Sequence, residues 1–498
     1  MATKVYSTPG VYIEEKNAFP NTVVAVPTAV PAFIGFTERA IRGRKSLINV
    51  PTRITSLAEY VSFFGGPPHT TFTVTPTEDT IYSMEIDKDT QYNMYWAIRM
   101  FYANGGGPCY IVSVGDYSSP VSATPLNDLE NEGGLVTILK EPEPTLVVIP
   151  DAVLLEQADC SSLQQAMLNH CGLETKSRFA ILDVHDGYKS RTMADDDVVT
   201  AFRNGIGTNF LQWGASYYPW LNTTIVQENE VDYRNVSNLD TLGEILTKEV
   251  EDALAASLIK EKRANEIKAE IEKLADTEAD SISVHNTLKA VSPTYKEIMN
   301  DIRMNLNVMP AAPAMAGLYS LVDNAMGVHK APANVSVNAT VNPTINLSSE
   351  QQEDLNMPLN GKAVNAIRTF VGKGTLVWGA RTMDGNSMDW RYINVRRTMT
   401  MLEQSIKIAC EAFVFAPNDA NTWTTVKAMI DNFLKNQWKS GALAGSVPAD
   451  AYSVDIGLDV TMTPQDILDG IMKITVKVAI SRPAEFIVIT FQQQMQKS

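Results

Sequence analysis

Apolar residues recur every three or four positions between residues 395 and 415, at Val395, Met399, Leu402, Ile406, Ala409 and Phe413. This spacing puts them on one face and predicts a long amphipathic helix. Off that face, on the expected polar side, fall Arg396, Arg397, Glu403, Lys407 and Glu411. Residues 416–419 are expected to end this helix and to supply an Asx-type cap, and a second helical pattern runs over 423–438. The stretch 378–445 therefore predicts a strand end, two helices and a glycine-rich close.

Short apolar runs alternate with helical stretches over residues 135–226. The runs at 145–150, 179–184 and 213–218 are typical of buried strands. Helical patterns lie between them, at 161–171 and 195–204. This alternation predicts an α/β domain with a mainly parallel sheet.

The part of the chain before residue 115 shows a similar mixture. A buried strand is expected at 32–36, helices at 52–64 and 91–102, and a strand at 109–114. The glycine run at 104–108 follows a helix and precedes a strand. A phosphate-binding loop needs the opposite order, because the phosphate meets a helix N-terminus. The run therefore predicts an ordinary loop.

Charged residues of both signs dominate residues 240–280, where the leucines and isoleucines form only a broken heptad. This favours a surface helical excursion over a self-standing coiled coil. The Met-, Pro- and Ala-rich stretch 309–317 and the segment 327–334 are expected to be loop-like. Further strands are expected at 334–347, 375–378, 451–463 and 474–480, with a helical turn at 464–470.

Both ends of the chain carry short β-prone runs, within residues 8–15 and 483–491. The candidate strand residues are Val11, Tyr12, Ile13 and Glu14 near the N-terminus and Phe486, Ile487, Val488 and Ile489 near the C-terminus. An isolated strand cannot form a sheet with itself. Each run must therefore pair with its own domain or with another chain.

The amino-acid composition and the net charge argue against some classes of function. The 498 residues are 45% hydrophobic and carry a net charge of -16, which argues against a general nucleic-acid binder. The N-terminus has no apolar core of a secretory signal, and no apolar run reaches the roughly 18 residues that span a bilayer. The four cysteines form no C-x-x-C pair and are expected to be reduced thiols in a cytosolic product.

Candidate catalytic chemistry is confined to His185, which follows Asp183 by two residues at a strand end. The five histidines show neither H-x-H nor H-x-x-x-H spacing, so a metal site is not predicted. The sequence also lacks the G-x-S-x-G, Walker A and post-strand G-x-G-x-x-G patterns. No catalytic, cofactor-binding or metal-binding residues are therefore assigned, and an enzyme is not expected.

Four stretches together resemble the tail sheath proteins of contractile injection machines, meaning phage tails, R-type tailocins and extracellular injection systems. They are T-P-G-V-Y-I-E-E at 8–15 with A-F-I-G at 32–35; G-V-H-K-A-P-A-N at 327–334; V-W-G-A-R-T at 377–382 with Y-I-N-V-R-R at 392–397; and F-A-P-N at 415–418 with G-A-L-A-G at 441–445 and P-A-E-F-I-V at 483–488. They occur in the family's order. Two departures are Ala416, where the family commonly has Glu, and His329, which replaces an aromatic residue.

The resemblance implies a multidomain protein of mixed α/β and α+β class. An inner α+β sheath domain would be built from both ends of the chain, with an inserted outer α/β domain and extended terminal β arms. The implied parts are an N-terminal arm (1–25), the N-terminal part of the inner domain (26–115), the outer domain (116–359) with the charged helix 240–280, the C-terminal, tube-facing inner domain (360–482) and a C-terminal arm (483–498).

The resemblance also implies a structural role. Stacked hexameric rings would surround an inner tube, and contraction from a metastable extended state would drive the tube through a target envelope. The terminal arms would add strands to neighbouring subunits. Implied partners are further copies of the chain, the inner tube protein, and baseplate and terminator or cap proteins, with no cofactor, no nucleic acid and no direct membrane insertion. Assembly would occur in the bacterial cytoplasm without a signal peptide, for a phage tail or a released extracellular particle.

The helix at 423–438 is the candidate for contact with the tube. One face carries Lys427, Lys435 and Lys439, with Asp431 between them. The opposite, buried side is expected to contain Val426, Ile430, Phe433, Leu434 and Trp438. An ordinary solvated face accounts for the same lysines, so both interpretations stay open.

Other functions stay open as well. A non-contractile structural tube or shell protein would share the terminal arms. An α/β enzyme centred on His185 is a third hypothesis. A sheath split between two proteins is disfavoured because one chain carries the motifs of both ends.

Overall fold

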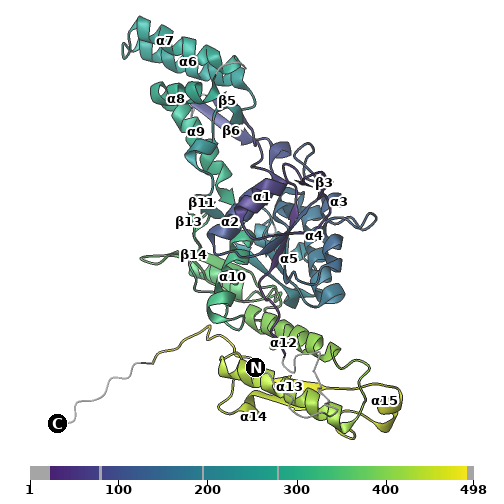
Figure 1. The fold of residues 1–498 in the computed structure, drawn as a ribbon. Helices are drawn as coiled ribbons and strands as arrows, with labels where there is room; N and C mark the ends of the chain where they lie inside the picture. Colours follow the sequence, from purple (N-terminus) through teal and green to yellow (C-terminus); the bar gives the residue numbers. More distant parts are fainter. Residues whose placement is uncertain (1–22, 78–80, 193, 195, 277–279, 491–498) are drawn as a thin grey trace, which may run out of the picture. The chain divides into compact units, whose positions relative to one another are not determined.

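The computed structural model describes residues 23–77, 81–192, 194, 196–276 and 280–490 (Figure 1). The chain forms two compact units. Among the described residues, unit 1 combines 23–26 with Met401–Ser481, and unit 2 combines Pro27–Thr400 with 482–490. These units do not follow the expected boundaries at 115 and 359, because strands from all three of those parts lie in one sheet.

That sheet has eight strands and forms the centre of unit 2, in the order β15-β14-β10-β9-β8-β1-β7-β4. The six strands from β14 to β7 run parallel, and β15 and β4 pair antiparallel at the two edges. The bounds are β1 Pro31–Gly35, β4 Thr52–Ile54, β7 Cys109–Ser113, β8 Leu146–Val148, β9 Phe179–Asp183, β10 Gly214–Tyr218, β14 Asn365–Phe370 and β15 Gly374–Val377. The predicted α/β character is confirmed, and the sheet extends beyond residues 135–226.

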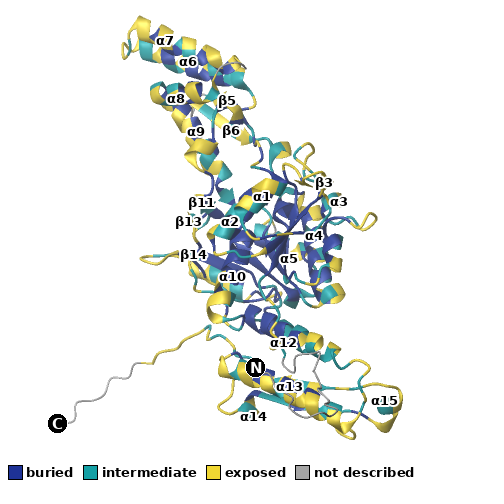
Figure 2. Cartoon of the chain, in the orientation of Figure 1, coloured by how far each residue is buried: buried dark blue, intermediate teal, exposed yellow. Residues whose placement is uncertain are grey.

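The central strands are buried on both faces, which explains their nearly continuous apolar sequences. Alternate residues supply two separate cores. Phe33, Ile111 and Ile181 belong to one of them, and their chain neighbours Ile34, Val112 and Leu182 belong to the other. Figure 2 shows these strands in the buried colour. The helices of unit 2 that accompany the sheet are α1 Leu57–Phe64, α2 Met94–Ala103, α3 Ala123–Leu126, α4 Gln157–Asn169, α5 Val198–Gly205, α10 Ala312–Met326 and α11 Ser349–Asn356.

Two predictions for unit 2 were wrong in part. The pattern at 52–64 is not one helix: β4 comes first, and α1 starts only after its N-cap Ser56. The stretch 309–317 is not loop-like, since it contains the end of β12 (Val308–Met309) and the start of α10. Pro313 lies in the first turn of α10, where a proline costs no hydrogen bond.

A helical module lies next to a hairpin formed by β5 (Phe72–Thr77) and β6 (Ile81–Ile86). The charge-rich stretch 240–280 forms two helices rather than one, and two more follow. They are α6 Leu239–Ala255, α7 Glu261–Glu272, α8 Ser281–Val291 and α9 Pro293–Leu306. Hydrogen bonds between the Asn238 side chain and the backbone of Val74 join the module to the hairpin.

Two smaller sheets complete unit 2. One contains β12 with β11 (Leu221–Thr223) and β13 (Thr340–Pro343), and the other pairs β2 (Ile41–Arg42) with β3 (Lys45–Ser46). Within the expected strand 334–347, only β13 is a regular strand.

Unit 1 contains the second part of α12 (Ile393–Glu411) together with α13 Ala420–Lys439, α14 Pro448–Ala451, β16 Tyr452–Asp455, α15 Pro464–Leu468 and β17 Thr475–Val478. The predicted cap before the second long helix is confirmed, because the side chain of Asp419 accepts a hydrogen bond from Thr422 N at 2.9 Å. The apolar face of α13 packs on β16. None of the described helices combines the length and apolar character that crossing a bilayer requires.

Candidate functional site

The two-stranded sheet of unit 1 is the first candidate surface for assembly. β16 and β17 pair antiparallel, from Tyr452 opposite Val478 to Asp455 opposite Thr475. Beyond them, Ala444 N donates to Ala479 O at 2.7 Å. Within the described part of the chain, no further strand pairs with the outer edges of β16 and β17. Such edges offer backbone N–H and C=O groups to a strand from elsewhere.

The second candidate is the run Phe486, Ile487, Val488 and Ile489, whose exposed fractions are 67%, 80%, 89% and 70%. Contiguous exposed apolar residues are typical of surfaces that bind a partner. These residues form no regular strand in the structure. The expected N-terminal strand residues Val11, Tyr12, Ile13 and Glu14 lie outside the described residues.

The polar face of α13 is the third candidate. Lys427, Lys435 and Lys439 are exposed, and Asp431 is half-buried. Burial raises the pKa of Asp431, with Lys427 acting in the opposite direction and Asp455 adding to the increase. The buried face contains the predicted Val426, Ile430, Phe433 and Leu434, whereas Trp438 is only partly buried. The structure thus exposes a lysine-rich face of α13 to solvent. Such exposure is expected both for a surface that contacts the tube and for an ordinary solvated face.

The first half of α12 contains two buried arginines. Arg396 and Arg397 fall off the apolar face of the predicted helix, yet both are buried. The Arg396 guanidinium lies 4.2 Å from the ring centroid of Trp213 and 4.3 Å from that of Trp390. Stacking on aromatic faces replaces part of the hydration that a buried guanidinium loses.

Arg397 binds the carboxylate of Asp323 with two nitrogens, at 2.6 and 3.0 Å. Its Nη2 also donates to Thr28 O at 2.9 Å, and the Thr28 hydroxyl donates to Asp323 at 2.6 Å. The start of α12 therefore holds α10, which carries Asp323, and the segment that precedes β1.

The central sheet has a point where its strand order reverses, between β1 and β8. In open α/β sheets, ligands bind there, at the carboxyl ends of the strands. Here Asp151 occupies the position. Its carboxylate accepts hydrogen bonds from Phe36 N at 2.9 Å and from Asn93 N, at the start of α2, at 2.6 Å. Burial raises the pKa of Asp151 to about 6, against the effect of these backbone donors.

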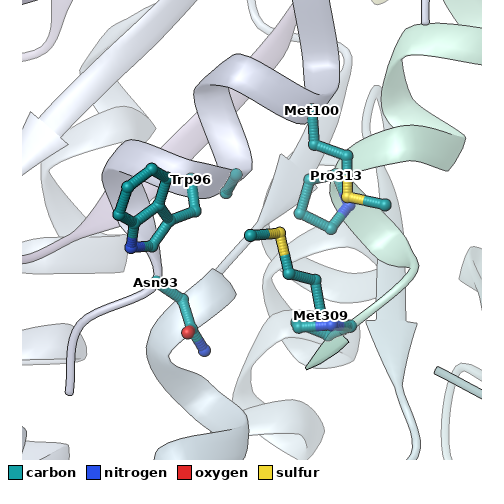
Figure 3. A pocket seen from close by; sticks show the side chains of 7 residues that line it. Asn93, Trp96, Met100, Met309 and Pro313 are labelled. Atoms are coloured by element: carbon teal, nitrogen blue, oxygen red, sulfur yellow. The ribbon is translucent and has the colours of Figure 1, made fainter. Parts of the chain in front are cut away.

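The crevice beside Asn93 has a volume of about 10 Å³ (Figure 3). Trp96 and Met100 enter it from α2, Met309 from the end of β12 and Pro313 from the start of α10. This is room for about one water molecule, whereas a bound cofactor needs several hundred Å³. The crevice beside Asn93 is thus too small to hold a cofactor.

His185 and Asp183 do not form a dyad. His185 Nε2 lies 2.9 Å from Leu155 O. The Asp183 carboxylate instead accepts hydrogen bonds from Ala311 N and Ala312 N, at 2.8 and 2.9 Å, at the start of α10. Burial raises the pKa of Asp183 to about 7, although the two donors oppose the increase. Within the described ranges, no cluster of His, Cys, Asp and Glu has the geometry of a metal site.

The cysteines are free thiols. Cys109, Cys160 and Cys171 are buried, and Cys410 is half-buried. Burial raises the pKa of each of the first three to about 12, so they are protonated at neutral pH.

Comparison with known proteins gives these surfaces a context. Residues 386–494 match the family described as the phage tail sheath C-terminal domain. The tail sheath protein of Vibrio phage KVP40 is 24% identical over 190 residues, or 38% of this chain and 27% of that protein. The tail sheath protein of Burkholderia phage BcepMu is 28% identical over 141 residues, or 27% of this chain and 29% of that protein. The chain is thus matched to less than a third of the length of either of these relatives.

Solved structures are similar over nearly the whole chain. The sheath of an extracellular contractile injection system, PVC, in its contracted state has 27% sequence identity and a TM-score of 0.60, over 99% of both chains. The helical sheath of the anti-feeding prophage in its contracted state has 28% identity and a TM-score of 0.59, over 98% of this chain and 100% of the other. Residues 386–494 are therefore similar in sequence to phage tail sheath C-terminal domains, and the chain as a whole is similar to the sheath proteins of contractile injection systems.

Proposed function

We propose that this chain is the sheath subunit of a contractile injection apparatus. Copies would assemble as stacked hexameric rings around an inner tube, and contraction from a metastable extended state would drive the tube through a target envelope. The relatives with solved structures are sheaths in contracted states, which supports contraction rather than a static tube. A chain in the baseplate structure of the anti-feeding prophage is also similar to this chain, with 27% identity, which supports a baseplate as partner.

One observation carries the proposal: in the described residues the run Phe486–Ile489 is exposed, and no strand pairs with the outer edges of the β16–β17 sheet. A run of β-prone residues that lacks a sheet, and a sheet whose edges lack a strand, are the two halves of a strand-addition interface. The C-terminal run of one copy would add to the β16–β17 sheet of another. By the same proposal, the N-terminal residues Val11–Glu14 add a further strand.

Proline substitutions test the strand addition. Consecutive residues of a strand direct their N–H groups to opposite sides, so Ile487→Pro and Val488→Pro remove donors from both sides of the run. We expect at least one of the two variants to give about tenfold fewer sheath polymers in negative-stain electron micrographs, because a ladder hydrogen bond is lost in every copy. Its thermal unfolding should match that of the parent, since these side chains are exposed.

The matched control is Val488→Thr, which keeps the N–H group and the β-branched shape. It should assemble like the parent. If both proline variants polymerise normally, the strand-addition interface is wrong.

Contraction is tested separately. Micrographs of particles formed with the tube should show two populations of sheath that differ in length and in diameter. A single, unchanging tube geometry before and after treatment with a denaturant such as urea would instead favour the non-contractile tube or shell protein.

A further inference from the structure

Arg381, which is buried, and Glu485, which is partly buried, form an ion pair at the start of the exposed C-terminal run. Arg381 Nε lies 3.0 Å from Glu485 Oε1, and Arg381 Nη2 lies 2.7 Å from Glu485 Oε2. The Arg381 side chain is 3% exposed and that of Glu485 is 19% exposed. Two parallel N–H···O bonds fix direction as well as distance, and burial keeps competing water away.

Other side chains complete the surroundings of this carboxylate. Asn356 Nδ2, at the end of α11, donates to Glu485 Oε1 at 2.7 Å, and the Tyr392 hydroxyl donates to Oε2 at 3.0 Å. The remaining guanidinium nitrogen, Arg381 Nη1, donates to Asn356 O at 3.1 Å. Glu485 is thus held by three residues from three segments of unit 2.

Arg381 itself is fixed to the central sheet. Its backbone N donates to Asn365 Oδ1 at 2.8 Å, and Asn365 Nδ2 donates back to Arg381 O at 2.8 Å. Asn365 is the first residue of β14, and its Nδ2 also lies 3.2 Å from Ser216 O on β10. A continuous chain of hydrogen bonds therefore leads from Glu485 through Arg381 and Asn365 to two neighbouring strands of the eight-stranded sheet.

The burial pattern changes at Glu485. Glu485 is partly buried, whereas every residue from Phe486 to Thr490 is exposed. Glu485 is therefore the point at which the chain leaves the surface of unit 2. A tension applied to the exposed run therefore reaches Glu485 before it reaches any residue of the eight-stranded sheet.

We propose that the Arg381–Glu485 pair is a mechanical anchor, which transmits tension on the C-terminal run to the eight-stranded sheet and prevents the run from peeling off unit 2. The proposal rests on the proposed function, in which another copy holds the run. The anchor keeps neighbouring rings joined while the copies of the chain move during contraction. Glu485 and Arg381 are positioning residues in this role, since neither belongs to the added strand itself.

The test compares Glu485→Gln with the parent and with Glu353→Gln, which neutralises an exposed carboxylate on α11. Gln keeps the size of Glu but loses the charge and presents an amide N–H₂ to donors. Particles formed with the tube are imaged before and after urea-triggered contraction, and broken sheaths are counted. Thermal unfolding of the purified chains is measured alongside. Tyr392→Phe, which removes one donor and no charge, provides a second and milder variant.

We expect Glu485→Gln to melt within a few degrees of the parent and to form extended sheaths. After contraction it should give at least fivefold more separated rings and short fragments than the parent or Glu353→Gln. Tyr392→Phe should give an intermediate number. A merely structural pair would lower the melting temperature and would not act selectively on contracted sheaths.

Failure of the proposed function and failure of the mechanical anchor give different results. If the parent chain forms no sheath, the proposed function fails. If the parent forms sheaths and both anchor variants contract without extra breakage, or if the anchor variants lose their fold, the mechanical anchor is wrong and the proposed function stands.

Discussion

At the scale of single residues, two buried carboxylates hold the starts of helices. Asp183 receives the first N–H groups around α10, and Asp151 receives one at the start of α2. Both carboxylates face backbone donors: Asp183 accepts from Ala311 N and Ala312 N, and Asp151 accepts from Phe36 N and Asn93 N. A carboxylate in this position is stabilised by the helix dipole but is penalised by its burial.

The Asp183 carboxylate gives a pH-dependent prediction. Its pKa is about 7 in the folded chain, against about 3.9 in an unfolded chain. The raised pKa of Asp183 stabilises the folded chain fully below about pH 4. This stabilisation is lost as the pH rises through 7, because the unfolded chain releases the Asp183 proton at a lower pH than the folded chain does. Asp183→Asn cannot titrate. Its free energy of unfolding, relative to the parent, should therefore increase by on the order of 4 kcal/mol between about pH 4 and pH 8.

Urea denaturation at several pH values measures this difference. Asp186→Asn is the control, since Asp186 is partly exposed and forms an ion pair with Lys189. Parallel pH profiles for Asp183→Asn and the parent would contradict the prediction.

The burial of two arginines could not be predicted from the sequence pattern. Arg396 and Arg397 fall off the apolar face of their helix, and a pattern assigns such residues to water. Their partners are Trp213 and Asp323, which are far away in the sequence. Helical periodicity contains no information on such partners. The motif V-W-G-A-R-T does include Arg381, but only the structure shows that its partner is Glu485.

At the scale of elements, the close approach of α2 and α10 depends on Gly317. A Cβ at this position would lie 2.5 Å from Phe101 O on α2, which is backbone and cannot rotate away. Gly317→Ala should therefore lower the free energy of unfolding by about 1–3 kcal/mol, as overpacking does.

Gly243, in α6, is the matched control. A Cβ there would meet only Ile271 Cγ2, at 3.8 Å, which is an ordinary contact. Gly243→Ala should raise stability by about 0.5–1 kcal/mol through helix propensity. Thermal or urea unfolding of both variants measures the contrast, and an equal effect of the two substitutions would contradict this account of the packing.

The elements themselves were largely predictable where periodicity is strong. The strands β7, β8, β9 and β10 and the helices α2, α12 and α13 all coincide with apolar patterns in the sequence. The start of α10 was missed because its prolines and glycine are typical of loops. Small residues suit this helix because it lies against α2, and Pro313 lies in its first turn. Tertiary packing, rather than local preference, decides its structure.

At the scale of the whole molecule, the acidic chain presents a local basic face on α13, and we propose that this face contacts the tube. Lys427→Glu combined with Lys435→Glu should reduce the number of extended sheaths on tubes about tenfold, because an attractive surface becomes a repulsive one. The parent's assembly should also weaken at high salt, where screening shortens electrostatic range. Electron micrographs of particles provide both measurements.

The double variant should fold normally, since both lysines are exposed. Lys407→Glu, which reverses an exposed charge on α12, is the control for a charge reversal away from α13. Normal extended particles from the Lys427 and Lys435 double variant would remove α13 as the tube contact. The sequence alone suggested this face from spacing, but which surfaces meet in an assembly depends on partners that one chain does not encode.

The path of the chain through the two units has a consequence for how the protein can evolve. Residues 27–400 interrupt unit 1, and at the interruption Val26 N donates to Ser405 Oγ at 3.0 Å. Unit 1 therefore holds the entry and the exit of the interrupting segment close together, the arrangement in which domain insertions are tolerated. We expect lineages to have enlarged, trimmed or exchanged parts of unit 2 while the interrupted unit stayed the same. Foreign domains placed in the α6–α7 connection would exploit the same modularity for display on the particle.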